Sequence, residues 1–439
     1  MTKTEIIDAA FRVWGRNFYR KTSLSQLATE LKVSKPALYR HFLNKQALNA
    51  AMTERFFDDF AAYIKTDMLN GLNSVNPDND ISSIIKNISG FFAKNVYLLY
   101  FSLINIYDRN IDGQTISDNL KARNVDMGVI QVLIDKKYLH DTVVIRLIFA
   151  TLTFLMSDFH KSRKTMENPP SDEDVNNISL IILKTIQSGL GFSLDDSKID
   201  FERLEKLVQE MPFEHEQITG ADNSESSRFF KAVAQAVAQA GPWDVSMEMV
   251  AKKLGLSKSS LYVHFKNRKD MLRRLFITEF KRIFAFAKQG ISLSSDTREQ
   301  LYLGLFTISV YLRARPEILI AIDWIRTRKL ELGKGVEKHH EIFRLFEYID
   351  IKSFEIESAD KAAVKDDYKL NRSHLIIFLL INVLTQSVPQ DTDDNKKMIW
   401  LCDGLCMSAS SETVTGNIQN HYIRILYKFI LNGLGGFLR

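Results

Sequence analysis

Apolar residues in the first fifty positions follow the spacing of short α-helices. They recur three or four residues apart, which gathers them on one face of each helix. The predicted core positions are Ile6, Ile7, Ala10, Phe11 and Trp14 on a first helix, Leu24, Leu27, Ala28 and Leu31 on a second, Leu38 and Phe42 on a third, and Leu48 and Met52 on a fourth. Two short helices joined by a tight turn, packed on one helix and followed by another, predict a helix-turn-helix head.

The same pattern returns 223 residues later. The segments "SKPALYRHFLNK" at 34–45 and "SKSSLYVHFKNR" at 257–268 agree at seven of their twelve positions. The match continues upstream at the same offset, where Ser23 and Ala28 correspond to Ser246 and Ala251. A second echo links "LKTIQSGLGF" at 183–192 with "YKFILNGLGGF" at 427–437. A period this long indicates duplicated domains rather than a solenoid of short repeats.

The second copy keeps the local signals of the first. Its apolar positions are Met247, Val250, Ala251 and Leu254 on the supporting helix, and Leu261 and Phe265 on the next. Gly255 suits the turn because glycine readily adopts positive φ. Ser34 and Ser257 are each placed to cap the helix that follows, and Pro36 sits near the start of its helix, where a missing N–H costs little.

Strongly apolar segments close both repeats. The segments Val143–Met156 and Leu375–Leu384 are apolar nearly all round, and Ile178, Ile182 and Ile186 make a stripe. Together with 423–430 they must be covered, and two such helices from each repeat would form a four-helix bundle. We therefore predict an all-α protein of two tandem repeats packed as an intramolecular pseudo-dimer, which predicts a monomeric chain.

The repeat sets the expected domain boundaries. We predict a helix-turn-helix head at 1–50 (head 1), a helical regulatory body at 51–211, a linker at 212–227, a second head at 228–275 (head 2) and a second body at 276–439. The linker segment "PFEHEQITGADNSESS" contains proline, glycine, asparagine and serine with few apolar residues, which is typical of a connection between domains.

Positive charge is concentrated in the two heads. Residues 1–55 hold ten Lys/Arg and four Asp/Glu, giving +6, and residues 225–282 hold twelve and five, giving +7. The whole chain carries +5, so the remainder carries +5 − 13 = −8. Two basic islands on an acidic body indicate that both heads meet a polyanion.

The segments "LATELKVSKPALYRHFLNKQAL" and "VAKKLGLSKSSLYVHFKNRKDML" resemble the head of the TetR family of bacterial transcriptional regulators. The resemblance covers about 45 residues of each repeat. It implies an all-helical subunit of about 200 residues, with a ligand-binding body and pairing through the last two helices. Three positions depart from the family pattern: Phe18 replaces a glycine, Lys32 replaces the glycine of the turn, and Pro242 follows Gly241 where an aromatic residue is usual.

Candidate DNA-binding residues follow from the placement of the second short helix in a major groove. Short side chains allow close approach, and a few long ones reach base edges. The groove-facing candidates are Lys35, Pro36, Ala37 and Arg40 in head 1, and Lys258, Ser259 and Ser260 in head 2, where Val263 replaces Arg40. The resemblance implies that Tyr39, His41, Tyr262 and His264 hold the DNA backbone. Ser23, Ser246, Lys45 and Arg268 lie near helix starts that suit phosphate contacts.

Other classes of protein receive little support. The longest apolar run, Leu375–Ile381, is too short to cross a bilayer, and the N-terminus shows no signal-peptide core. Two cysteines, Cys402 and Cys406, fit a reducing compartment and form no convincing metal site alone. We see no catalytic constellation and no motif for a cofactor or metal. The embedded polar residues Asp158, His160, Asp323, Trp324, Arg326, His374 and Asn382 are candidates for a ligand pocket or for paired interface groups.

The sequence therefore predicts a cytoplasmic DNA-binding transcriptional regulator rather than an enzyme or membrane protein. Its expected partners are double-stranded DNA and a small-molecule effector. We expect a repressor whose two heads read the half-sites of an asymmetric operator. The alternative is a helical interaction or sensor protein whose heads no longer bind DNA.

Overall fold

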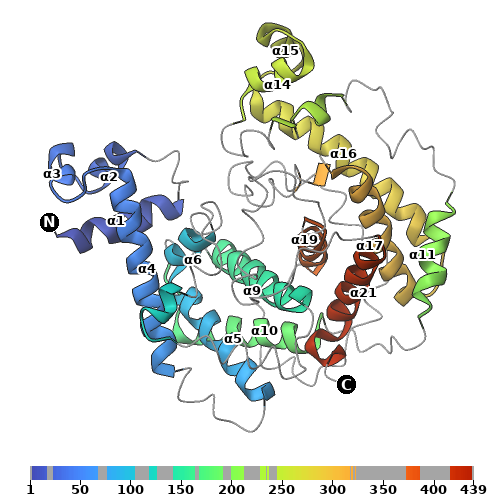
Figure 1. The fold of residues 1–439 in the computed structure, drawn as a ribbon, viewed down its shortest axis with the longest axis horizontal. Helices are drawn as coiled ribbons and strands as arrows, with labels where there is room; N and C mark the ends of the chain where they lie inside the picture. The colour runs from blue at the N-terminus through green and yellow to red at the C-terminus, as the bar shows by residue number, and fades with distance from the viewer. Residues whose placement is uncertain are drawn as a thin grey trace. The chain divides into compact units, whose positions relative to one another are not determined.

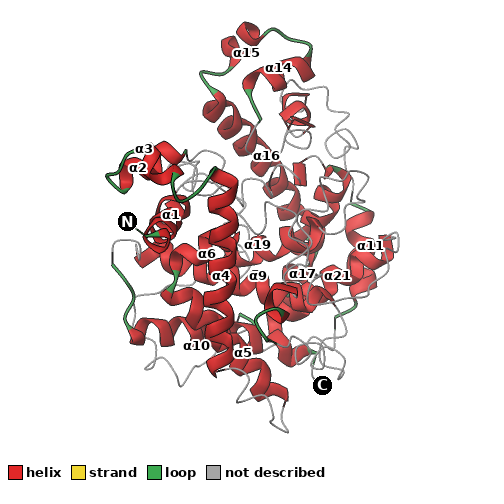
Figure 2. Ribbon diagram, turned by 60° about the vertical axis from the view of Figure 1, so that its left-hand side comes forward, coloured by secondary structure: helices red, strands yellow, loops and turns green. Residues whose placement is uncertain are grey.

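The computed structural model describes residues 2–16, 23–67, 77–103, 118–125, 142–163, 168–190, 199–211, 228–233, 235–236, 245–316, 318–319, 322, 372–385 and 416–437. Every regular element within these ranges is a helix, and none is a strand (Figure 2). The prediction of an all-α fold is confirmed. The described residues divide into two compact units, with unit 1 ending at Ile186 and unit 2 beginning at Gln187.

Unit 1 contains head 1 and four helices of a body. The head comprises α1 (Lys3–Arg16), α2 (Leu24–Glu30), α3 (Lys35–Tyr39) and the start of α4 (Lys45–Asp67). The body adds α5 (Pro77–Lys94), α6 (Val96–Phe101), α9 (Thr142–Arg163) and α10 (Asp172–Ser188), whose last two residues belong to unit 2. The short helices α2 and α3 lie near one end of the long helix α4 (Figure 1).

A continuous apolar core joins head 1 to its body. The predicted head positions Ile6, Leu27, Leu38 and Leu48 are all buried within it. The ring of Phe11 on α1 meets that of Phe101 on α6 edge-on, with centroids 5.0 Å apart. Such aromatic contacts bury large areas and stabilise the packing of α1 against α6.

Unit 2 repeats the plan of a head at the end of a long helix. Helical residues 228–233 and 235–236 precede α14 (Met247–Leu254), α15 (Lys258–His264) and α16 (Arg268–Ile291). The body contains α17 (Thr297–Ala314), α19 (Arg372–Thr385), α21 (Gly416–Asn432) and the 3₁₀ turn η8 (Gly433–Gly436). Figure 1 shows α14 and α15 at the far end of α16. Their predicted anchors Val250, Ala251, Leu261 and Phe265 are buried.

The body helices bury the apolar segments that the sequence singled out. In α9, Leu147, Leu155 and Met156 are fully buried, and α19 buries nearly every residue between Leu375 and Leu384. A Cβ added to Gly290 on α16 would lie 2.0 Å from Oγ1 of Thr307 on α17. Glycine at this position therefore allows these two helices to pack closely.

Helix α11 (Phe201–Gln209) does not pack in the part of the chain that the repeat predicts for it. Its position after the first repeat assigns it to the first body, whereas its contacts place it in unit 2, against α17. Leu204 and Val208 form its buried stripe. The ring of Phe201 lies edge-on to that of Tyr302, with centroids 4.7 Å apart.

The two echoed closing segments meet within unit 2. Gly189 and Gly433, which occupy corresponding positions, both adopt left-handed backbone, with φ of 68° and 55°. The N–H of Leu190 donates a hydrogen bond to the carbonyl oxygen of Ile430 at 2.8 Å. A Cβ on Gly189 would lie 2.5 Å from that same oxygen, so the close approach requires glycine.

Candidate nucleic-acid interface

The supporting helix of each head begins at a serine cap. In head 1, Ser23 Oγ accepts a hydrogen bond from the N–H of Gln26 at 3.3 Å, and Gln26 Oε1 accepts one from the N–H of Ser23 at 2.8 Å. This reciprocal pair is a capping box. In head 2, Ser246 Oγ accepts from the N–H of Met249 at 3.2 Å. Both serines therefore fix a helix start, and Ser23 remains exposed while Ser246 is partly buried.

The turn between the two short helices has the same backbone conformation in both heads. Lys32 and Gly255 are 223 residues apart and both have positive φ, of 54° and 69°. The N–H groups of Val33 and Leu256 each bond back to a helix carbonyl at 2.9 Å, on Ala28 and Ala251. The departure at Lys32 therefore preserves the turn, in a conformation that glycine adopts at lower energy.

The second short helix is held differently in the two heads. Ser257 caps α15 by accepting from the N–H of Ser260 at 3.0 Å. Ser34 occupies the same position before α3, but its side chain makes no capping hydrogen bond, so the predicted side-chain cap is wrong there. Pro36 lies at the start of α3, as predicted. Helix α3 is also shorter, with five residues against seven in α15.

Most of the predicted contact residues lie on the surface of their head. The exposed ones are Lys35, Pro36, Tyr39 and Arg40 in head 1, and Lys258, Ser259, Tyr262 and His264 in head 2. The partly buried ones are Ala37, His41, Lys45, Ser260 and Arg268. Lys258 lies 3.9 Å from a carboxylate oxygen of Glu248, and this exposed pair leaves it accessible. Each head thus combines a small-residue helix face with basic side chains.

Two strongly exposed apolar residues lie on the heads. Leu43, between α3 and α4, is 81% exposed, and Val263 on α15 is 83% exposed. Val263 occupies the position of Arg40, which the sequence predicts to face bases, and the helical period places it on the face of Ser259 and Ser260. Leu43 was not among the predicted contacts, and no periodic signal marks it because it lies outside a helix.

The long helix after each head starts at an asparagine cap. Asn44 Oδ1 accepts from the N–H of Ala47 at 2.8 Å, and Asn267 Oδ1 accepts from the N–H of Asp270 at 2.9 Å. In head 2 the carboxylate of Asp270 also accepts from the N–H of Lys266 at 3.2 Å. These bonds fix the helix starts that carry Lys45 and Arg268.

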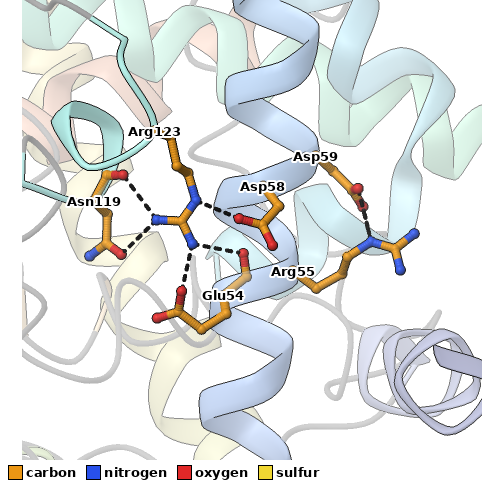
Figure 3. Close-up of polar contacts among 6 residues, drawn as sticks. All are labelled: Glu54, Arg55, Asp58, Asp59, Asn119 and Arg123. Carbon is orange, nitrogen blue, oxygen red and sulfur yellow. Dashed lines mark hydrogen bonds and ion pairs between the residues drawn. The ribbon is translucent and has the colours of Figure 1, made fainter. Parts of the chain in front are cut away.

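An arginine from the body clamps α4 in unit 1. Arg123 Nε donates to Asp58 at 2.6 Å and its Nη2 to the carboxylate of Glu54 at 2.5 Å, while Nη1 donates to the carbonyl of Asn119 at 2.9 Å (Figure 3). Its guanidinium also lies over the ring of Phe57, 5.7 Å from the centroid. The clamp fixes the long helix of head 1 against the body.

Unit 2 fastens α16 with a different and more deeply buried cluster. Arg315, just after α17, donates from Nη1 to Glu279 on α16 at 2.7 Å and to the hydroxyl of Tyr311 at 2.7 Å. Tyr311 also donates to Glu279. Burial first, and then the charge of Glu279, raise the pKa of Tyr311, which keeps the phenol protonated. In both units, an arginine of the body therefore fastens the long helix that follows the head.

Of the embedded polar residues, the structure describes Asp158, His160, His374 and Asn382. His160 is buried and donates from Nε2 to the carbonyl of Phe92 at 2.9 Å, so it is a paired interior group. Asp323, Trp324, Arg326, Cys402 and Cys406 lie outside the described residues, as do Phe18, Gly241, Pro242 and the linker. The described residues contain no cluster of three metal-ligating side chains. None of their helices is both long and apolar enough to span a bilayer.

Comparisons with known proteins match the two heads. The model of the bacterial regulatory proteins of the tetR family matches residues 6–52 and again residues 230–275. No curated protein matches the chain.

Two similar solved structures are regulators. The fatty acid degradation regulator FadR from Bacillus halodurans shares 16% identity over 48% of this chain and 96% of its own, with a TM-score of 0.33. A TetR family transcription regulator from Marinobacter aquaeolei VT8 shares 18% identity over 42% of this chain and 97% of its own, with a TM-score of 0.29.

The two family matches coincide with the two helix-turn-helix heads built above, and each lies in its own compact unit. The chain therefore carries two DNA-binding domains of the tetR family of bacterial regulatory proteins in tandem.

Proposed function

We propose that the chain is a cytoplasmic transcriptional repressor whose two heads bind the two half-sites of one operator. The observation that carries this proposal is the presence of two helix-turn-helix heads in one chain, each with exposed basic residues on its second short helix. Two-headed binders of this kind meet half-sites about one helical turn apart, near 34–36 Å, or multiples of that distance.

The operator is asymmetric in this proposal. A homodimer presents the same reading helix twice, whereas here Arg40 of head 1 corresponds to Val263 of head 2. Pro36 and Ala37 likewise correspond to Ser259 and Ser260. These positions are exposed or partly buried on their heads, which supports a role for them in contacting bases.

Pairing of the two repeats as a pseudo-dimer is supported by the closing segments. Gly189 and Gly433 occupy corresponding positions of the repeat, and the chain around Gly189 bonds directly to the end of α21. An effector in either body would act by binding one arrangement of the heads more tightly than the other. The Arg123 and Arg315 clusters provide the mechanical link, because they tie α4 and α16 to the bodies.

The proposal is tested by mobility shift of the full chain on its own upstream DNA at low and high salt. The logarithm of the affinity should fall with the logarithm of salt concentration, by about 0.9 for each phosphate neutralised. Arg40→Ala should relax sequence preference in one half-site only. Absence of binding to any duplex at low salt would overturn the proposal and would favour the interaction-protein alternative.

A further inference from the structure

Exposed apolar side chains are concentrated on the two heads. Seven large apolar side chains are exposed among the described residues, and five of them belong to the heads: Tyr39, Leu43, Leu256, Tyr262 and Val263. A single exposed apolar residue is ordinary on a protein surface. Their concentration in corresponding parts of both heads indicates that a partner covers these surfaces.

The surroundings of Val263 point to the floor of a DNA groove as that partner. Val263 shares a helix face with Ser259 and Ser260, whose small side chains permit close approach. Segment 225–282 carries twelve basic and five acidic residues, so the surface around it attracts a polyanion. The positive charge around Val263 disfavours a hydrophobic protein partner, because burial of the valine would also bury these charged groups.

The hydroxyl groups on this face already have partners within the head. Ser257 Oγ lies 2.9 Å from Ser259 Oγ and 2.7 Å from Ser260 Oγ, so the three hydroxyls form one hydrogen-bonded group. Val263 is 83% exposed, so this face presents an aliphatic side chain to solvent beside hydroxyls that are already hydrogen-bonded. An aliphatic side chain has one specific partner among major-groove base edges, the 5-methyl group of thymine.

The two heads also exchange apolar and basic residues. Head 1 has Arg40 followed three positions later by Leu43, while head 2 has Val263 followed three positions later by Lys266. All four side chains are exposed. Arginine, the residue type that most often contacts guanine, is thus present at Arg40. At the corresponding position Val263 can contact only the methyl group of thymine.

We propose that Val263 reads the 5-methyl group of a thymine in the half-site of head 2, at the position where Arg40 of head 1 reads a guanine. This inference rests on the proposed function, because it presupposes that both heads bind duplex DNA. It names the chemical difference that makes the two half-sites unequal.

The test begins with the duplex that the full chain selects from random sequences. Arg40→Ala identifies the half-site of head 1 by the loss of preference there. In the other half-site, each thymine is then replaced in turn by deoxyuridine, which lacks only the 5-methyl group. One replacement should weaken binding of the unaltered chain about fourfold, since it removes the burial of a single methyl group.

Val263→Ala should bind the unmodified duplex more weakly and lose the sensitivity to that deoxyuridine. The matched control is Arg40→Ala, which should keep the full deoxyuridine effect in the half-site of head 2. Because Val263 is exposed, its truncation leaves the core of the head intact, and helix content by circular dichroism checks this.

The outcomes distinguish failure of this inference from failure of the proposed function. A chain that binds no duplex overturns both. A chain that binds duplex DNA but shows no loss at any deoxyuridine overturns the inference alone, as does a Val263→Ala variant that keeps the same loss. Capture of a protein through Val263, with DNA binding unchanged by the variant, also overturns it.

Discussion

At the scale of single residues, the turn of the head shows how the same conformation is reached at different cost. Lys32 and Gly255 both have left-handed backbone, with φ of 54° and 69°. An L-residue with a Cβ is strained there by roughly 1–2 kcal/mol, whereas glycine is not. Nothing lies within 4 Å of a Cβ built on Gly255, so backbone strain is the only local cost of adding one.

We expect Lys32→Gly to stabilise unit 1 by about 1 kcal/mol, since relief of strain exceeds the entropy that glycine adds to the unfolded chain. The unfolding midpoint of the corresponding transition, followed by circular dichroism, should rise by roughly 2–4 °C. Gly255→Lys is the matched control and should lower the stability of unit 2 by a similar amount. Destabilisation by both substitutions would contradict this explanation of the turn.

A buried histidine makes unit 1 sensitive to acid. Burial lowers the pKa of His160 to about 4, although the hydrogen bond to Phe92 opposes this. The ordinary pKa of a histidine is 6.5, so between pH 6.5 and about pH 4 the unfolded chain binds a proton that the folded chain does not. The contribution of His160 is therefore complete above pH 6.5 and falls as the pH drops toward 4.

We expect the free energy of unfolding of unit 1 to fall by about 1 kcal/mol between about pH 7.5 and about pH 5.5 through this histidine alone. Urea unfolding of the unaltered chain and of His160→Gln would measure the difference. Glutamine can still donate to the carbonyl of Phe92 but does not titrate. The free energy of unfolding of the variant should therefore fall less over this pH range. Equal losses in the two proteins would assign the acid sensitivity to other groups.

At the scale of elements, α11 is fastened to unit 2 by a buried carboxylate. Glu205 accepts hydrogen bonds from the hydroxyl of Tyr302 at 2.6 Å, from Nδ2 of Asn420 at 2.8 Å and from Nε of Arg424 at 2.7 Å. Burial raises the pKa of Glu205, but the bonds from Arg424 and Tyr302 outweigh it and lower the pKa overall. The carboxylate is therefore ionised and joins α11 to both α17 and α21.

We expect Glu205→Gln to loosen α11, because loss of a charged hydrogen-bonding group costs about 2 kcal/mol. Amide hydrogen exchange over residues 201–209, measured by mass spectrometry, should accelerate roughly thirtyfold in the variant. Glu202→Gln on the exposed side of the same helix should leave the exchange unchanged. Unaltered exchange in Glu205→Gln would show that the apolar stripe alone holds α11.

The helices of this protein were easier to predict from the sequence than the surfaces against which they pack. Spacing predicted the helices of both heads, because burial of one face of a helix requires that spacing whatever covers the face. It could not predict that α11 is covered by unit 2, since Leu204 and Val208 fit any apolar surface. The sequence also could not predict that Ser34 makes no side-chain capping bond, because serine suits the N-cap position whether or not its hydroxyl points to the helix.

At the scale of the whole molecule, the two repeats share a backbone conformation at their closing segments and differ at particular positions of their reading helices. Gly189 and Gly433 keep the same left-handed conformation, and the first lies against Ile430 where no side chain fits. Among the positions exposed in both reading helices, Lys35 and Tyr39 match Lys258 and Tyr262, whereas Pro36 and Arg40 are replaced by Ser259 and Val263. The repeats thus keep one glycine conformation in the segments proposed to pair them, and they differ at some of the positions proposed to contact bases.

A pseudo-dimer fills its own pairing surface, so we expect the chain to remain a monomer. Sedimentation should give the mass of one chain, 50.5 kDa, independent of concentration. The DNA complex should likewise contain one chain for each operator, which the mass of the complex measures. Twice the mass in either experiment would imply four heads in the assembly and would contradict the pseudo-dimer.

The docking of α11 also fixes the order in which the protein can mature during synthesis. Glu205 precedes its partner Arg424 by 219 residues. At a translation rate of roughly 5–20 residues per second, the ribosome needs on the order of 10–40 s to supply that partner. For this interval α11 lacks the hydrogen bonds that α21 supplies, although α17 is synthesised earlier. Unit 2 is therefore incomplete until α21 leaves the ribosome. A chain truncated before α21 would lack Asn420 and Arg424, so their hydrogen bonds to Glu205 would not form.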